Sequence, residues 1–175
     1  KWVSKLQSYG IEVTKVKGKG YLLKEPLILL DSKKIRSLLK SKNFTIDIVE
    51  SIDSTNNYLN NHDKSAIPHI CIAEHQTSGR GRFSRNWYSP FGKNIYFSMQ
   101  YSIKQDISQL GGLSLAIGTI ACRAIEKACK LPNCLMLKWP NDIMYNGKKL
   151  AGVLIEIRAE VNGNCSVIVG VGINV

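Results

Sequence analysis

The sequence lacks the long apolar stretches of membrane and secreted proteins. No run of about eighteen consecutive apolar residues, the length of a membrane-spanning helix, occurs in it. Its first residues do not show the charged-then-apolar pattern of a signal peptide. We therefore predict a cytoplasmic protein with no membrane segment.

Metal-binding and disulfide patterns are also missing. The five cysteines form no CxxC pair, and the three histidines complete no Cys/His cluster of zinc-like spacing. An odd number of cysteines with apolar neighbours indicates reduced, buried thiols. Because Cys122 and Cys129 are seven residues apart in a predicted helix, we expect both on one face, packed in the core.

Acidic residues are scarce compared with basic ones. The 24 lysines and arginines and 13 acids give a net charge of +11. Residues 1–40 hold ten basic residues against three acids, whereas residues 41–175 hold fourteen against ten. The basic front piece suggests contact with a polyanion. With 175 residues that are 44% hydrophobic, the chain can form one domain with a small appendage.

Residues 1–26 have the pattern of a helix followed by a basic hairpin. Apolar residues recur at helical spacing up to Gly10, which suits a helix C-cap. Residues 11–16 and 21–23 read as strands around a turn that contains Lys17 and Lys19. This order is typical of the end of a winged helix-turn-helix, in which wing lysines contact DNA phosphates. The alternative is a hairpin with a purely structural role.

Residues 27–175 alternate irregularly between helical and strand patterns. We predict a helix over 31–39 with Asp31 as its N-cap, and a core helix over 107–130 whose Gly111, Gly112 and Gly118 pack against a sheet. Strands are predicted at 44–49, 70–73, 94–102, 135–138, 143–145, 149–157 and 165–171, with turns at Asn146-Gly147 and Asn162-Gly163. The pattern favours an α+β fold, a mixed sheet with helices on one side.

Polar residues gather where two predicted strands end. Residues 51–57, SIDSTNN, follow the first strand, and Ser54 or Thr55 can cap a short helix there. Gln76 lies just beyond the second strand. The same hydroxyl and amide groups are also equipped to hydrogen-bond a small polar ligand.

The stretch Gly79 to Trp87, GRGRFSRNW, places three arginines and two glycines in a loop. Glycines let the backbone approach a ligand closely, and guanidinium groups bind carboxylates and phosphates bidentately. The loop therefore indicates an anion-binding site, with a solvated basic loop as the alternative. The aromatic residues from Trp87 to Phe91 either close over a ligand or anchor the loop to the core.

The Asn146-Gly147 hairpin should bring Asp142 close to Lys149. A simple ion pair is one interpretation. The other is that Lys149, which opens the apolar strand LAGVLIE, points inward at an anionic substrate.

Six segments together resemble the biotin protein ligases, in the order of that family and over nearly the whole chain. They are Ser51–Asn56, Gln76–Arg82, Trp87–Pro90, Lys138–Asp142, Lys149–Gly152 and Gly170–Asn174. The resemblance implies a class II synthetase-like catalytic domain of the biotin/lipoate ligase type over residues 27–175. Biotin would first react with ATP and Mg²⁺ to give biotinyl-5'-AMP. Its biotinyl group would then pass to a lysine of the biotin carboxyl carrier protein of acetyl-CoA carboxylase.

The family also implies roles for individual residues. Arg80, Gly81 and Arg82 would lie in the loop that orders over biotin and the adenylate, and Lys149 would contact the biotin carboxylate and later the adenylate phosphate. The catalytic residues would be Lys149, Arg82 and Asp142, the last near the Mg²⁺ of ATP. The biotin-binding residues would be Ser54, Thr55, Asn56, Gln76, Gly79, Arg80, Gly81, Arg82, Trp87 and Lys149. The nucleotide-binding residues would be Arg80, Arg82, Trp87, Lys138, Asn141, Asp142 and Lys149.

The winged-helix remnant at residues 1–26 resembles the bifunctional bacterial members, which also repress biotin synthesis genes. We expect the chain to be truncated at both ends, without most of the DNA-binding domain and without the C-terminal β-barrel. Operator DNA would be a partner of the full-length protein only, and a homodimer is expected. The alternatives are a lipoate-type ligase and a biotin-sensing repressor without ligase activity.

The clamp role of the arginine loop predicts slow loss of bound adenylate. Arg82→Gly should accelerate adenylate dissociation, because it removes a guanidinium from the loop. An unchanged dissociation rate in this variant would rule out the clamp.

Overall fold

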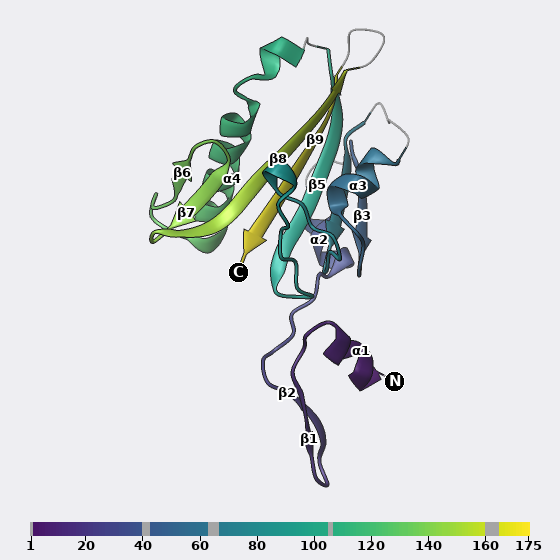
Figure 1. Cartoon of the computed structure of the whole chain (residues 1–175). Coiled ribbons are helices and arrows are strands. Elements are labelled where there is room, and N and C mark those ends of the chain that lie inside the picture. Colours follow the sequence, from purple (N-terminus) through teal and green to yellow (C-terminus); the bar gives the residue numbers. More distant parts are fainter. Residues whose placement is uncertain (1, 40–42, 63–66, 105–106, 160–164) are drawn as a thin grey trace.

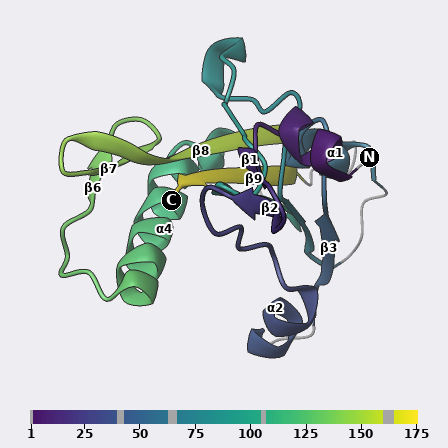
Figure 2. The ribbon, with the colours of Figure 1, turned by 90° about the horizontal axis from the view of Figure 1, so that it is seen from below.

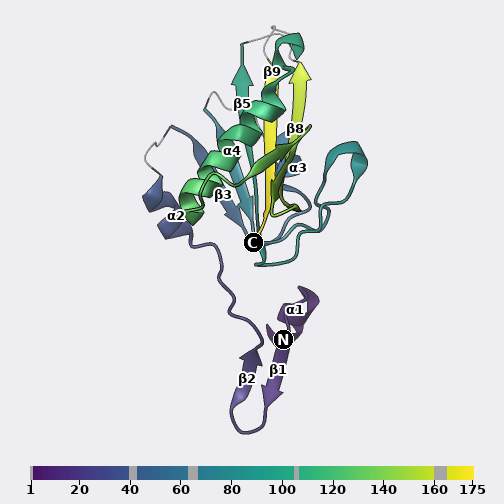
Figure 3. The same cartoon turned by 90° about the vertical axis from the view of Figure 1, so that its left-hand side faces the viewer.

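The computed structural model describes residues 2–39, 43–62, 67–104, 107–159 and 165–175 (Figure 1). The predicted turn at Asn162-Gly163 lies outside these ranges. The basic front piece forms helix α1 (Trp2–Ser8) and an antiparallel hairpin of β1 (Val13–Val16) and β2 (Gly20–Leu23). Gly10 follows α1 with φ +78°, the left-handed conformation expected of a C-terminal cap. The hairpin extends away from the rest of the molecule (Figures 1 and 3).

A seven-stranded sheet forms the rest of the fold, in the order β3-β4-β5-β9-β8-β7-β6. Only β3 and β4 pair in parallel, so the sheet is mixed, as predicted. Asn146 and Gly147 form the predicted hairpin turn, both with positive φ. The strands are β3 (Thr45–Val49), β4 (His69–Ala73), β5 (Asn94–Ile103), β6 (Met136–Lys138), β7 (Asp142–Tyr145), β8 (Lys148–Ala159) and β9 (Cys165–Asn174).

Helices cover both faces of this sheet, so the prediction of helices on one side was wrong in that detail. Helix α4 (Leu113–Cys129) covers a core of alternate residues of β8 and β9, including Val153, Val167 and Val169. Helix α3 (Thr55–Asn60) packs on the opposite face, against Ile168. Figure 3 shows α4 in front of the sheet and α3 behind it. Residues of opposite parity in β9 therefore face different helices, which the apolar pattern of that strand does not reveal.

The predicted core helix over 107–130 is interrupted at its start. A short 3-10 helix, η2 (Ile107–Leu110), precedes α4, and Gly112 occupies the N-cap position. Two successive glycines disfavour a continuous helix, which accounts for the break. Gly111 and Gly112 have no close neighbours, whereas a Cβ on Gly118 would lie 2.8 Å from Leu137 Cδ2. Of the three glycines, only Gly118 packs against the sheet.

The short helix α2 (Ser32–Leu38) begins as predicted. The Asp31 carboxylate accepts hydrogen bonds from the backbone N–H groups of Lys33 and Lys34. The segment before it is held by the buried Glu74, whose carboxylate accepts from Leu30 N. No helix within the described ranges has the length and apolar character needed to cross a membrane.

All five cysteines are free thiols, as expected, but they are not all buried. Cys71, Cys122 and Cys165 lie in the core, and burial raises the pKa of Cys71 to about 12. Cys129, the last residue of α4, is exposed, so the expectation that it packs in the core with Cys122 was wrong, and Cys134 is half-buried.

Leu59 should be a key contact between α3 and the sheet. It is fully buried against Cys71 and Ile168, so Leu59→Ala should lower the free energy of unfolding by about 2–5 kcal/mol. Leu38→Ala in α2 is a matched control, since Leu38 is 71% exposed, and should change the free energy by about 0.5 kcal/mol or less. The measurement is urea denaturation. Equal losses of unfolding free energy in the two variants would contradict the role of Leu59 as a key contact between α3 and the sheet.

Candidate functional site

A cavity of about 450 Å³ lies between the arginine loop, the N-terminus of α3 and the segment that leads into β7. Its size is that of a pocket for a small molecule. Twelve of the predicted site residues line it, although they come from distant parts of the sequence. They are Ser54, Thr55, Asn56, Gln76, Arg80, Gly81, Arg82, Trp87, Lys138, Asn141, Asp142 and Lys149.

Three predicted residues do not line this cavity. Gly79 packs beneath the loop, where a Cβ would lie 2.5 Å from both Ser89 Oγ and Trp87 O. Only glycine fits that space, so Gly79 shapes the loop from behind. Lys17 and Lys19 lie at the turn of the β1–β2 hairpin, which extends away from the seven-stranded sheet (Figure 1).

The arginine loop is a tight hairpin that projects from the sheet (Figure 2). Gly81 N donates to Arg85 O at 2.7 Å, and Trp87 N donates to Gly79 O at 2.8 Å. At its tip, Phe83 and Ser84 both have φ of 55°. This left-handed conformation is unfavourable for residues other than glycine, most of all for a bulky one, so the tip stores backbone strain.

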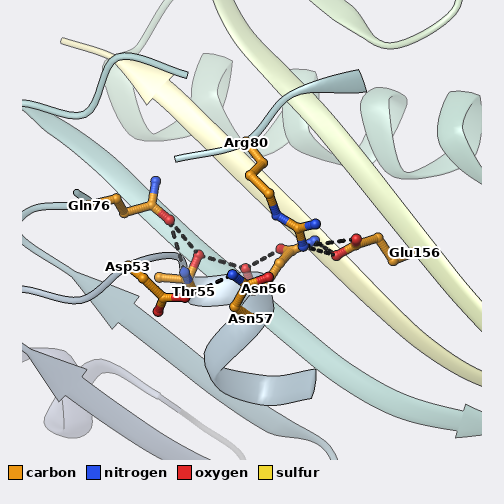
Figure 4. Close-up of polar contacts among 8 residues, drawn as sticks. Asp53, Thr55, Asn56, Asn57, Gln76, Arg80 and Glu156 are labelled. Atoms are coloured by element: carbon orange, nitrogen blue, oxygen red, sulfur yellow. Dashed lines mark hydrogen bonds and ion pairs between the residues drawn. The ribbon is translucent and has the colours of Figure 1, made fainter. Parts of the chain in front are cut away.

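The floor of the cavity is a hydrogen-bonded polar layer (Figure 4). Gln76 Oε1 accepts from Thr55 N at 2.9 Å, and Gln76 Nε2 donates to Ser89 Oγ at 2.9 Å. The hydroxyl of Ser98 lies 2.7 Å from Thr55 Oγ1 and 2.5 Å from Asn56 Oδ1. Because Ser98 is fully buried, the two α3 residues are held in fixed positions.

Glu156 and Ser98 are two parts of this site that the sequence analysis missed. One carboxylate oxygen of Glu156 accepts from Asn56 Nδ2 at 2.7 Å, and Arg80 Nη2 lies 2.9 Å from both oxygens. Glu156 was detectable as the only acid in the apolar strand of β8. Ser98 lies on the face of β5 that also carries Tyr96 and Gln100, and this face is the buried one.

Asn56 approaches the backbone of β9 where a side chain would prevent it. A Cβ on Gly170 would lie 2.2 Å from Asn56 Oδ1. The glycine therefore makes room for the amide that contacts Glu156 and Ser98. This close approach explains why a glycine interrupts the apolar residues of β9.

Lys149 and Asp142 form the predicted ion pair, with Lys149 Nζ 2.6 Å from Asp142 Oδ1. A register shift between β7 and β8 lies beside Lys149, which is consistent with a bulge that aims its side chain at the cavity. The neighbouring Asn141 donates through Nδ2 to Val153 O at 2.7 Å. The two interpretations of Lys149 are thus compatible, because the paired lysine also lines the cavity.

The aromatic residues after the loop divide between two tasks. Trp87 lies on the glycines of β8 and β9, since a Cβ on Gly172 would be 2.6 Å from its ring, and Lys149 Nζ is 5.1 Å from the ring centroid. Its buried indole N–H has no hydrogen-bond partner among the described residues. Phe91 instead stacks on Tyr9 of the front piece, with centroids 4.4 Å apart, and is buried. Trp87 is placed to contact a ligand, and Phe91 anchors the loop.

His75 has a structural environment outside this cavity. Its Nδ1 lies 2.8 Å from Ser51 Oγ, and its ring contacts Tyr9. Burial lowers the pKa of His75, so the neutral imidazole is favoured. Among the described residues, no group of three or more histidine, cysteine and acidic side chains could hold a metal ion.

Comparison with known proteins connects this arrangement to one family. The profile of the Biotin/lipoate A/B protein ligase family matches residues 48–174. The chain is 39% identical over 175 residues to the bifunctional ligase/repressor BirA of Salmonella typhimurium. That alignment covers 99% of this chain and 53% of the relative, so the chain spans about half the length of that protein.

Two solved structures have a similar fold. One is the biotin protein ligase of Aquifex aeolicus in complex with biotin and ATP, with a TM-score of 0.60 and 33% identity over 75% of this chain and 52% of that one. The other is the biotin protein ligase of Leishmania major in complex with biotinyl-5-AMP, with a TM-score of 0.64 and 27% identity over 75% and 57%. The chain belongs to the biotin/lipoate protein ligase family.

The close approach at Gly170 can be tested by stability. Gly170→Ala should lower the free energy of unfolding by about 1–3 kcal/mol, because the new methyl group displaces the amide of Asn56 from its partners. Gly111→Ala is the control, since a Cβ there meets nothing within 4 Å. The measurement is urea denaturation, and an unaffected Gly170→Ala variant would show that Asn56 is not confined.

Proposed function

We propose that this chain is the biotin-activating part of a biotin protein ligase. The observation that carries the proposal is the convergence of Arg80, Arg82 and Lys149 on one cavity whose floor consists of fixed hydrogen-bonding groups. The cations suit a carboxylate and a phosphate, and the floor suits the ureido ring of biotin. The names of the relatives and the ligands of the two solved structures support this assignment.

The first step joins two anions. A carboxylate oxygen of biotin attacks the α-phosphorus of ATP, a carbon–oxygen–phosphorus anhydride forms, and pyrophosphate leaves. Repulsion between carboxylate and phosphate opposes this approach, and fixed positive charge offsets it most strongly where water is excluded. We assign that role to Lys149 and Arg82, with Arg80 beside them.

In the second step, the amine of an acceptor lysine attacks the acyl carbon and AMP leaves. We propose the biotin carboxyl carrier protein of acetyl-CoA carboxylase as the acceptor. Ser54, Thr55, Asn56 and Gln76 would bind the ureido end, and Trp87 would cover the ligand beside them.

The nucleotide would lie toward the segment that precedes β7. Lys138, Asn141 and Asp142 line that end of the cavity. Mg²⁺ is commonly held by one or two carboxylates together with substrate phosphates. Asp142 offers one such carboxylate, and because it is paired with Lys149, it would bind an ion that arrives with ATP once Lys149 has turned to the substrate.

The whole protein is proposed to have further partners. The α1–β2 segment resembles the end of a winged helix, and Lys17 and Lys19 at its turn would contact the phosphates of operator DNA. The name of the Salmonella relative, a ligase/repressor, supports this role. We also propose a homodimer and a cytoplasmic location, the latter supported by five free thiols.

Pyrophosphate release tests the reaction. Biotin with Mg-ATP should release pyrophosphate, whereas lipoic acid with Mg-ATP should release much less. Pyrophosphate release with lipoic acid and Mg-ATP, but not with biotin and Mg-ATP, would favour the lipoate-type ligase. Binding of biotin without release would favour a biotin sensor.

Lys149→Gln should lower the rate of adenylate formation at low biotin roughly 10- to 100-fold, because it removes a charge-assisted contact. Lys148→Gln is the matched control, since Lys148 is the preceding residue of β8 and lies outside the cavity lining. Single-turnover assays compare the two variants. Equal losses of rate in the two variants would show that the loss of one positive charge on β8, and not the loss of a contact with the ligand, causes the effect.

A further inference from the structure

Glu156 lies behind the cavity and contacts two residues that line it. Its carboxylate accepts from Asn56 Nδ2, and Arg80 Nη2 lies within 2.9 Å of both of its oxygens (Figure 4). Glu156 itself is absent from the cavity lining. The hydrogen bonds of Glu156 therefore reach a ligand through Arg80 or Asn56.

The contact with Asn56 fixes the direction of its amide. An ionised carboxylate only accepts hydrogen bonds, so Asn56 must turn its Nδ2 toward Glu156. Its Oδ1 then faces Ser98, whose hydroxyl lies 2.5 Å away. The glutamate thereby sets which groups of Asn56 face the rest of the cavity.

The contact with Arg80 fixes one nitrogen of its guanidinium. Only Nη2 reaches Glu156, so the Nε–H and Nη1 groups, which point to different sides of the guanidinium, remain for a ligand. Both side chains are about one-third exposed, 38% for Arg80 and 33% for Glu156, so the pair contributes little to stability. What the ion pair with Glu156 determines is the position of the Arg80 guanidinium.

The same network ties the two ends of the arginine loop together. From Arg80 it runs through Glu156 and Asn56 to Ser98, Thr55 and Gln76, and it ends at Ser89, whose hydroxyl donates to Trp87 O. The beginning and the end of the loop are thus joined through the cavity floor. Glu156 is the link that connects Arg80 to this floor.

We propose that Glu156 is a positioning residue that holds the guanidinium of Arg80 in place for the acyl-adenylate. The inference rests on the proposed function for its ligand. In this proposal the arginine loop is held to β8 by Glu156, in addition to its contacts with the substrate. An arginine held before the ligand arrives loses less conformational entropy on binding.

Glu156→Gln isolates this role, because glutamine keeps an oxygen that can accept from Asn56 but loses the charge that holds Arg80. The dissociation of biotinyl-5'-AMP, formed in the protein from labelled biotin and Mg-ATP, should accelerate roughly 3- to 10-fold. In an Arg80→Ala background, the same substitution should change the rate less than about twofold. Glu126→Gln is the control, since Glu126 accepts a hydrogen bond from Leu135 N far from the cavity and its loss changes the net charge equally.

A full effect of Glu156→Gln in the Arg80→Ala background would overturn the proposal, as would wild-type dissociation in Glu156→Gln itself. A second measurement does not depend on the ligand. The NMR signal of the Arg80 Nε–H should be resolved in the wild-type protein and broadened or shifted to the free-arginine position in Glu156→Gln. If the wild type forms no adenylate, the proposed function fails, and the NMR comparison alone decides whether Glu156 positions Arg80.

Discussion

The concentration of positive charge around one cavity is the constraint on which this structure depends. Lys149 is paired with Asp142 and Arg80 with Glu156, whereas the guanidinium of Arg82 lies over the ring of Phe83, 4.9 Å from its centroid. These pairings offset mutual repulsion of the cations and fix their directions. The partly exposed pair of Lys149 with Asp142 is weak enough to exchange for the oxygens of a substrate, whereas the pair with Glu156 keeps Arg80 in place. The site is therefore organised and still able to bind an anion.

The backbone around the cavity provides space for this arrangement. Gly170 admits Asn56 against β9, and Gly152 and Gly172 admit Trp87 and Lys149 against the sheet. Gly79 admits Ser89 and the carbonyl group of Trp87 below the loop. Each of these glycines lies opposite a particular side chain or carbonyl group, so their spacing follows the contacts of the site and not a repeating motif.

Much of the site could be predicted because its residues are unusual for their local structure. Polar groups at the ends of β3 and β4, arginines between glycines, and Lys149 beside the Asn146-Gly147 turn all stand out in the sequence. The role of Glu156 depends on Arg80, 76 residues away, and local patterns carry no information about such a pairing. The distribution of α3 and α4 over the two faces was missed for a similar reason, since β9 is apolar on both sides. The break in the helix before Leu113 could have been predicted from Gly111 and Gly112. The apolar residues around these glycines led instead to the prediction of one continuous helix.

The most direct test of the account is whether the cations recognise the carboxylate of the ligand. Calorimetric titrations with biotin and with biotinamide, its neutral analogue, compare two molecules with the same ureido ring and the same chain. If Arg82 and Lys149 bind the carboxylate, biotin should bind roughly tenfold or more tightly, as expected for a charge-assisted contact. Equal affinities would contradict the account, because they would mean that the cavity holds the ureido ring without using its positive charge.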